Sequence, residues 1–389
     1  MLSAASIRAR LIAAWLALLG AAEAAPHDPR PDEPAFHGFP HALVSYDFSD
    51  PGSRAARAQV DGGRLERAEL RAEPRGVVLR PDSEDAARQA VFELAPYSVS
   101  RPFREVLLSW NVETPPGAGF RVEARIARAA GDWSPWLAVG EWGTVPKETR
   151  VEAFDGGRVD VDHLRLAEPH ERVQVRLRGF RAESAAGARL RVERVSICVS
   201  DLADLIRTPA DPCFGTEAPR GRLDVPFRSQ TAEDPEIASR ICSPTSLAMV
   251  LAFRGIDRPT AEVAARAFDP VHDLYGNWPR NVQAAFSYGV PGYVTRFSRW
   301  HQVSEMLRGG QPLIFSIRAD EGELRGAPYP STKGHLLVLT GYDGEGGCFV
   351  NDPAATGTTE GATTYRLADL ERVWLAKGGV AYVLLPPRK

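Results

Sequence analysis

Hydrophobic and polar residues alternate in short runs between residues 41 and 206, for example over 104–110, 120–126 and 173–177. Successive side chains of a β-strand point to opposite faces, so this alternation predicts strands that are buried on one face only. Turns rich in proline and glycine separate the runs, and no long helical pattern interrupts them. We therefore predict an all-β, sandwich-like domain over residues 41–206, in which two sheets bury their inward faces.

The pattern changes after residues 207–222, a segment dense in proline and glycine that we interpret as a linker. In residues 223–389 the apolar positions first follow helical spacing and later strand spacing. Helices are expected directly after Cys242, over 260–268 and over 298–308, and strands over 312–317, 335–342, 348–351 and 380–385. Helices followed by a sheet predict an α+β domain.

The first 24 residues have a basic start, an apolar run of about a dozen residues and a small-x-small site at Ala22-Glu23-Ala24. This is the pattern of a signal peptide, and the run is shorter than the roughly 20 apolar residues that span a bilayer. We expect a secreted or periplasmic bacterial protein without a transmembrane anchor after signal cleavage. Residues 25–40 are expected to form a flexible N-terminal segment.

Charge and composition exclude some classes of partner. The chain has 47 basic and 50 acidic residues and a net charge of -3, with no basic stripe for a nucleic-acid backbone. We expect no nucleic-acid partner and no cofactor. His163 and His170 lie near acidic residues, but their spacing fits no metal motif, so we interpret them as surface residues.

Three tryptophans, Trp133, Trp136 and Trp142, gather in one stretch of the β-rich region. Clustered tryptophans in a sandwich more often pack within the fold than bind a ligand. A surface for carbohydrate or for another cell-envelope ligand is the alternative for this N-terminal domain.

The chain has four cysteines, Cys198, Cys213, Cys242 and Cys348. In an oxidising compartment Cys198 and Cys213 could form a bridge that contributes about 3 kcal/mol. Cys242 and Cys348 would then be free thiols or a second pair.

Cys242 has the setting of a nucleophile. It lies at the start of a predicted helix, where the positive end of the helix dipole favours the reactive thiolate. His335, which follows Lys333-Gly334 at the start of a predicted strand, is the best candidate for the base. Asn351 or Asp352 could orient the imidazole after the next strand; the alternation of side chains lets only one of them face His335, and we choose Asp352.

Gln230 lies 12 residues before Cys242 and is a candidate donor to the oxyanion that forms during acyl transfer. The segments VPFRSQ, CSPTSLAMVLAFRG, GHLLVLTGYDG and FVNDPA together resemble the papain-like cysteine peptidases related to the bacteriocin-processing, double-glycine leader peptidases. The resemblance covers roughly residues 222–388. It implies Gln230 in the oxyanion hole, Cys242 as nucleophile, His335 as base and Asp352 as orienting acid.

The sequence thus predicts an exported cysteine peptidase-like hydrolase that cleaves a peptide or protein substrate through an acyl-enzyme. An acyl or peptidyl transferase with the same triad is one alternative, and trapping the acyl-enzyme with water or amines would separate the two. The other alternative is a catalytically inactive envelope-binding protein, which a disulfide between Cys242 and Cys348 would favour.

Overall fold

The computed structural model describes residues 41–387 except 74, 83–88, 129–131 and 202–219. The predicted signal peptide, the N-terminal segment, Cys213 and most of the predicted linker lie outside the described residues. Within the described residues no helix is both long and apolar enough to cross a membrane.

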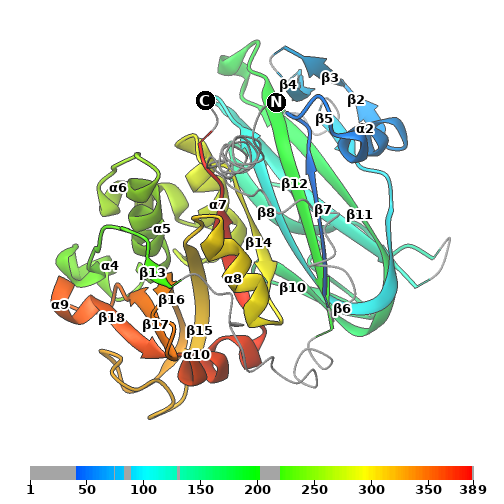
Figure 1. Cartoon of the computed structure of the whole chain (residues 1–389). Coiled ribbons are helices and arrows are strands. Elements are labelled where there is room, and N and C mark those ends of the chain that lie inside the picture. Colours follow the sequence, from blue (N-terminus) through cyan, green and yellow to red (C-terminus); the bar gives the residue numbers. More distant parts are fainter. Residues whose placement is uncertain (1–40, 74, 83–88, 129–131, 202–219, 388–389) are drawn as a thin grey trace, which may run out of the picture.

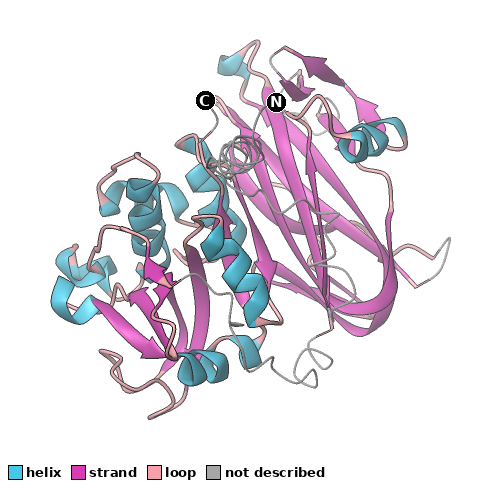
Figure 2. Cartoon of the chain, viewed as in Figure 1, coloured by secondary structure: helices cyan, strands magenta, loops and turns pink. Residues whose placement is uncertain are grey.

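The N-terminal domain is built almost entirely from antiparallel strands, as the alternating pattern predicts (Figures 1 and 2). Its elements are β1 (His41–Asp47), α2 (Arg54–Asp61), β2 (Arg64–Glu66), β3 (Ala68–Ala72), β4 (Arg75–Leu79), β5 (Ala90–Glu93), β6 (Tyr97–Glu113), β7 (Ala118–Ala127), β8 (Leu137–Gly143), β9 (Ala153–Phe154), β10 (Gly157–Asp160), β11 (His163–Arg181), η3 (Glu183–Ala185) and β12 (Leu190–Ser200).

These strands are joined in one hydrogen-bonded sheet of twelve strands, whereas the sequence pattern predicted two sheets. The reason is the length of two central strands, β6 with 17 residues and β11 with 19. Each pairs with different partners along its length, β11 with β6, β7, β5 and β10, and register shifts interrupt its ladder with β6. Long strands that change partners keep the hydrogen bonding continuous across the whole domain.

The C-terminal domain has helices on both sides of a seven-stranded antiparallel sheet in the order β14-β19-β15-β16-β17-β18, with β13 paired to β16 (Figure 2). Its elements are β13 (Gly221–Arg222), η4 (Gln230–Ala232), α4 (Pro235–Ala238), α5 (Cys242–Phe253), α6 (Thr260–Ala267), α7 (Trp278–Ser287), β14 (Gly292–Arg296), α8 (Trp300–Arg308), β15 (Leu313–Ala319), β16 (Thr332–Tyr342), β17 (Gly347–Asn351), α9 (Thr358–Gly361), β18 (Ala362–Arg366), α10 (Leu367–Val373), η5 (Leu375–Lys377) and β19 (Val380–Leu384). The sequence missed β13, α4, α7, β14, α9, β18 and α10.

Helix α5 is the central helix of this domain. Residues 243–251 are buried without a break, so the helix is enclosed on all sides by its own domain. Its C-terminal end is fixed by Gly255, whose positive φ of 83° lets the N–H groups of Gly255 and Ile256 bond to the carbonyls of Ala252 and Leu251. This closure fixes the far end of the helix that begins at Cys242.

The two domains meet along α7 and β14, which lie between the long strands and the other helices (Figure 1). The free edge of β14 faces β6: the N–H of Gly292 donates to Asn111 Oδ1 at 3.1 Å, and the N–H of Val294 donates to Ser109 Oγ at 3.0 Å. The side-chain amide of Gln283 in α7 pairs with both the N–H and the carbonyl of Val112, at 3.0 and 2.7 Å. Side chains therefore satisfy backbone groups that a further strand would otherwise bond.

A buried ion pair also crosses this interface. Arg296 in β14 and Glu105 in β6 are 4% and 7% exposed and lie 2.6 Å apart. A second guanidinium nitrogen of Arg296 donates to the carbonyl of Gly378 at 2.8 Å. Both charges are thus compensated within the protein.

Candidate active site

Cys242 is the first residue of α5, as the sequence predicts. No side chain caps this end of the helix, so its first N–H groups and the positive end of the helix dipole are left for the thiol and its surroundings. The Ser246 hydroxyl donates to the carbonyl of Leu336 at 3.1 Å, which ties α5 to strand β16 beside His335. This contact brings the helix start and the strand together.

His335 lies in β16, opposite Ile317 of β15, and is 5% exposed. Its Nε2 is 2.7 Å from Asp352 Oδ1, and the Cys242 thiol hydrogen-bonds to the same imidazole. Because Nε2 is used by the carboxylate, Nδ1 is the ring nitrogen left for the thiol. The structure thus brings the predicted nucleophile, base and orienting acid into one buried chain.

Asp352, and not Asn351, faces the histidine. Asn351 is the last residue of β17, and its side chain donates to the carbonyl of Val225 at 2.8 Å and accepts from Arg222 at 2.9 Å. Asp352 is fully buried and points the other way, toward His335. The choice that the sequence left open is decided in the structure by this alternation of side chains.

Four donors surround the Asp352 carboxylate. Oδ1 accepts from His335 and from the N–H of Ala354 at 3.0 Å. Oδ2 accepts from the hydroxyl of Tyr329 at 3.0 Å and from that of Tyr365 at 2.8 Å. The sequence analysis missed both tyrosines, which lie 23 residues before and 13 residues after Asp352. No local spacing connects either residue with the site.

The charges and hydrogen bonds among Cys242, His335 and Asp352 favour a thiolate beside an imidazolium. Burial raises the pKa of Cys242, but the hydrogen bond and charge of His335, with two backbone N–H groups, bring that pKa below its ordinary value. Burial lowers the pKa of His335, but Asp352 and Cys242 outweigh it and raise the pKa to about 10. Burial raises the pKa of Asp352, and the charge and hydrogen bond of His335 lower it overall.

Gln230 lies next to the row of hydrogen-bonded side chains formed by Cys242, His335 and Asp352. Its backbone N–H donates to the carbonyl of Pro353 at 2.8 Å, and its Nε2 donates to the carbonyl of Ala238 at 2.9 Å. The side chain is 7% exposed, and within the described residues its Oε1 accepts no hydrogen bond. An amide nitrogen carries two hydrogens, so one remains for a ligand after the bond to Ala238.

The cysteines differ sharply from one another. Among the described residues Cys198, Cys242 and Cys348 are all free, so the disulfide between Cys242 and Cys348 that would have blocked the nucleophile is absent from this structure. Burial raises the pKa of both Cys198 and Cys348. Cys242 is the only described cysteine whose pKa is lowered.

The interpretation of His163 and His170 as surface residues is wrong. They are 5% and 6% exposed. His163 stacks on Trp278 at a ring-centroid distance of 5.7 Å, and His170 Nδ1 bonds to the carbonyl of Glu168 at 2.8 Å. His163 was misjudged because the alternating pattern does not show that Trp278 of α7 packs against it. Within the described residues, no group of three or more histidine, cysteine or acidic side chains is arranged to hold a metal ion.

The faces of Trp133 and Trp136 are occupied by arginines. The Arg125 guanidinium lies 4.9 Å from the centre of the Trp133 ring and 4.6 Å from that of Trp136. Arg172 lies 4.7 Å from Trp133, and Arg176 lies 4.3 Å from Trp136. This alternating stack is the packing that the sequence favoured over an open platform for sugars.

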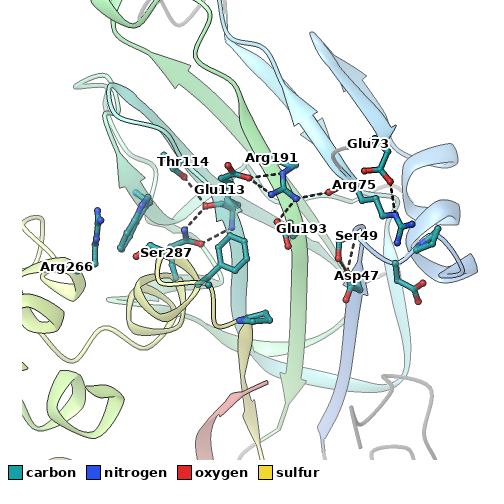
Figure 3. A pocket seen from close by; sticks show the side chains of 18 residues that line it. Asp47, Ser49, Glu73, Arg75, Glu113, Thr114, Arg191, Glu193, Arg266 and Ser287 are labelled. Carbon is teal, nitrogen blue, oxygen red and sulfur yellow. Dashed lines mark hydrogen bonds and ion pairs between the residues drawn. The ribbon is translucent and has the colours of Figure 1, made fainter. Parts of the chain in front are cut away.

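A cavity of about 910 Å³ lies between the domains (Figure 3), and neither Cys242 nor His335 lines it. Several of its charged side chains are paired with one another, with Arg191 between Glu113 and Glu193 and Arg75 beside Glu73. The cavity therefore belongs to the domain interface and not to the thiol site.

Comparison with known families matches both domains. The Peptidase_C39 like family matches residues 222–382, and the Peptidase C39 N-terminal domain matches residues 52–200. Comparison with curated proteins gives no match.

Three solved structures are similar to parts of the chain. The double glycine motif protease from an AMS/PCAT transporter, in complex with the leader peptide, is 23% identical over 43% of this chain and 95% of its own, with a TM-score of 0.30. The Clostridium thermocellum xylanase 10B CBM22-1-GH10 modules are 13% identical over 63% of this chain and 52% of theirs, with a TM-score of 0.21. The infectious bursal disease virus structure is 7% identical over 41% and 32%, with a TM-score of 0.22.

TM-scores this low support no conclusion about the chain, so the family matches carry the assignment. They agree with the free thiol of Cys242, whose pKa is lowered, and with the β-rich region that precedes it. Residues 222–382 thus form a peptidase C39-like domain, residues 52–200 form a Peptidase C39 N-terminal domain, and the protein is a cysteine peptidase.

Proposed function

We propose that this cysteine peptidase hydrolyses a peptide or related amide bond through an acyl-enzyme on Cys242, within an α+β papain-like domain. His335 is the base, and Asp352 orients and stabilises its ring. The observation that carries the proposal is the buried chain from the Cys242 thiol through His335 to Asp352, with 2.7 Å between Nε2 and Oδ1. A thiol with a lowered pKa beside such a histidine is the arrangement expected of a nucleophile.

The reaction follows from these positions. The Cys242 thiolate attacks the carbonyl carbon, and the carbonyl electrons move to oxygen. As the tetrahedral intermediate collapses, the C–N bond breaks and His335 Nδ1 gives its proton to the leaving amine. Water then attacks the thioester, His335 takes a proton from that water, and the C–S bond breaks to regenerate the thiolate.

The developing oxyanion needs donors. We propose the N–H of Cys242 at the start of α5 and the second amide hydrogen of Gln230. The buried position of Gln230, held by Pro353 and Ala238, supports this role because the amide is fixed before substrate arrives.

Alkylation of Cys242 with iodoacetamide across pH tests the proposal. We expect rapid labelling well below the pH at which an ordinary thiol, with a pKa of about 8.5, becomes reactive. Cys242→Ser should lose the label, and His335→Ala should slow labelling at pH 6 by about 10²-fold or more. Cys348→Ser is the matched control, since Cys348 is buried and its pKa is raised. Slow labelling of wild-type Cys242 at every pH below 8 would sink the proposal.

Export is a separate proposal, which rests on the sequence of residues 1–24. The N-terminal domain would then position the enzyme on its substrate or on a cell-envelope ligand. The mass of the protein recovered outside the cytoplasm tests export: a chain that begins near Ala25 supports cleavage, and a chain that still carries Met1 contradicts it.

A further inference from the structure

Two phenols from separate parts of the chain meet on the same oxygen of the catalytic acid. Tyr365 lies in β18 and is 1% exposed, whereas Tyr329 lies half-buried in the segment 320–331 between β15 and β16. Both hydroxyls contact Asp352 Oδ2, at 2.8 and 3.0 Å. A carboxylate only accepts hydrogen bonds, so both phenols donate to it.

These two bonds favour the ionised form of Asp352. A carboxylate without exposure to water would ordinarily become protonated, and each hydrogen bond to its charged form opposes this. Ionised Asp352 in turn stabilises the imidazolium of His335 and, through it, the thiolate of Cys242. The phenols therefore act on the nucleophile through Asp352 and His335.

Tyr329 makes a second contact, with the base itself. Its ring meets the His335 ring edge to face, at a centroid distance of 4.9 Å and an angle of 62°. The segment that carries it is held by two ion pairs with the end of the chain, Arg325 with Asp369 at 3.5 Å and Glu323 with Lys377 at 3.9 Å. Tyr329 thus covers the histidine and the carboxylate together, from a segment fixed at independent points.

We propose that Tyr329 and Tyr365 are positioning residues that hold Asp352 ionised and aligned with His335, with Tyr329 forming the wall that separates this pair from water. The inference rests on the proposed function. It adds two residues to the proposed active site. It also implies that Cys242 is reactive only when segment 320–331 is folded against His335 and Asp352.

The pH profile of Cys242 alkylation in Tyr329→Phe and Tyr365→Phe tests the inference. Each substitution keeps the ring and removes one donor, so Asp352 should take up a proton at higher pH than in the wild type. The acid limb of the profile should move upward by on the order of one pH unit for each variant, and further in the double variant. The rate near pH 8 should change by less than about threefold, because Asp352 is ionised there in every variant.

Tyr288→Phe is the matched control, because Tyr288 bonds to Glu262 and Arg266 outside the site. Its profile should follow that of the wild type. If the buried Tyr365→Phe variant fails to fold, as thermal unfolding would reveal, Tyr329→Phe decides alone.

The two proposals fail differently. If Cys242 of the wild type is not alkylated rapidly, the proposed function itself is wrong. A rapidly labelled wild type whose acid limb is unchanged in Tyr329→Phe and in the double variant would overturn only the role of the tyrosines.

Discussion

The active site and the domain interface each contain a buried histidine beside an aspartate, yet the two histidines differ in the partner of their second ring nitrogen. In the active site His335 bonds to Asp352 at 2.7 Å, and its other nitrogen faces a thiol. At the interface His163 lies 3.2 Å from Asp162, and its Nε2 accepts a hydrogen bond from Arg165 at 2.6 Å. A guanidinium cannot give up its proton, so this second histidine has nothing to activate.

The interface pair instead binds the domains together. Asp162 accepts from the N–H of Trp278 at 2.8 Å, and His163 stacks on the Trp278 ring. A histidine beside a carboxylate thus becomes a catalytic base only where its remaining nitrogen meets a group that can lose a proton.

The largest expected effect lies at the interface, on stability. Glu105→Ala would leave Arg296 buried without its partner, and we expect the free energy of unfolding to fall by about 3–5 kcal/mol. Glu113→Ala is the control, because Glu113 pairs with Arg191 but is 58% exposed, and such pairs contribute about 0–1 kcal/mol. Urea unfolding followed by fluorescence measures both. If the free energy of unfolding falls equally in the two variants, the buried pair of Arg296 and Glu105 contributes no more to stability than the exposed pair.

The next effect separates the two aspartates. Asp352→Ala removes the group that stabilises the imidazolium, and we expect Cys242 alkylation at pH 6 to slow by about 10²-fold. Asp162→Ala should leave that rate within about threefold, while lowering the temperature of unfolding. Rates are compared at a temperature where both variants are folded. If Asp162→Ala slows the alkylation of Cys242, the domain interface influences the reactivity of the thiol.

A third effect is the pH dependence of stability. The pKa of His335 is raised to about 10, so its contribution is complete below about 6.5, the unfolded value, and is lost as pH rises through 10. Asp352 has a lowered pKa, so its contribution is present above about 3.9 and is lost as pH falls through the lowered value. The stability difference between wild type and His335→Gln should therefore narrow from pH 6 to pH 10.5.

The sequence was most informative where chemistry and local structure coincide. Cys242 at a helix start and His335 in a strand could both be predicted, and the β-rich first half followed from alternation. The orienting acid could only be narrowed to two neighbours, because a turn of given length does not fix which face of a strand it continues.

Contacts between distant segments could not be predicted in the same way. Tyr329 and Tyr365 reach Asp352 from a loop and from another strand, and neither has a local signature. Helix α7 was missed because its residues are partly polar, and some of these polar side chains are buried against the other domain. His163 was misplaced on the surface for the same reason, since its burial depends on Trp278.

The pairing of Gln283 with Val112 has a consequence for which substitutions the interface can tolerate. The amide contacts only the backbone of Val112, so this bond itself places no demand on the side chain at position 112. Position 283 has no such freedom, because its side chain must both accept from an N–H and donate to a carbonyl. Glutamate has the same length but would set a carboxylate oxygen against that carbonyl, and leucine would leave both groups unbonded. In natural variants we therefore expect this bond to restrict the residue at position 283 but not the residue at position 112.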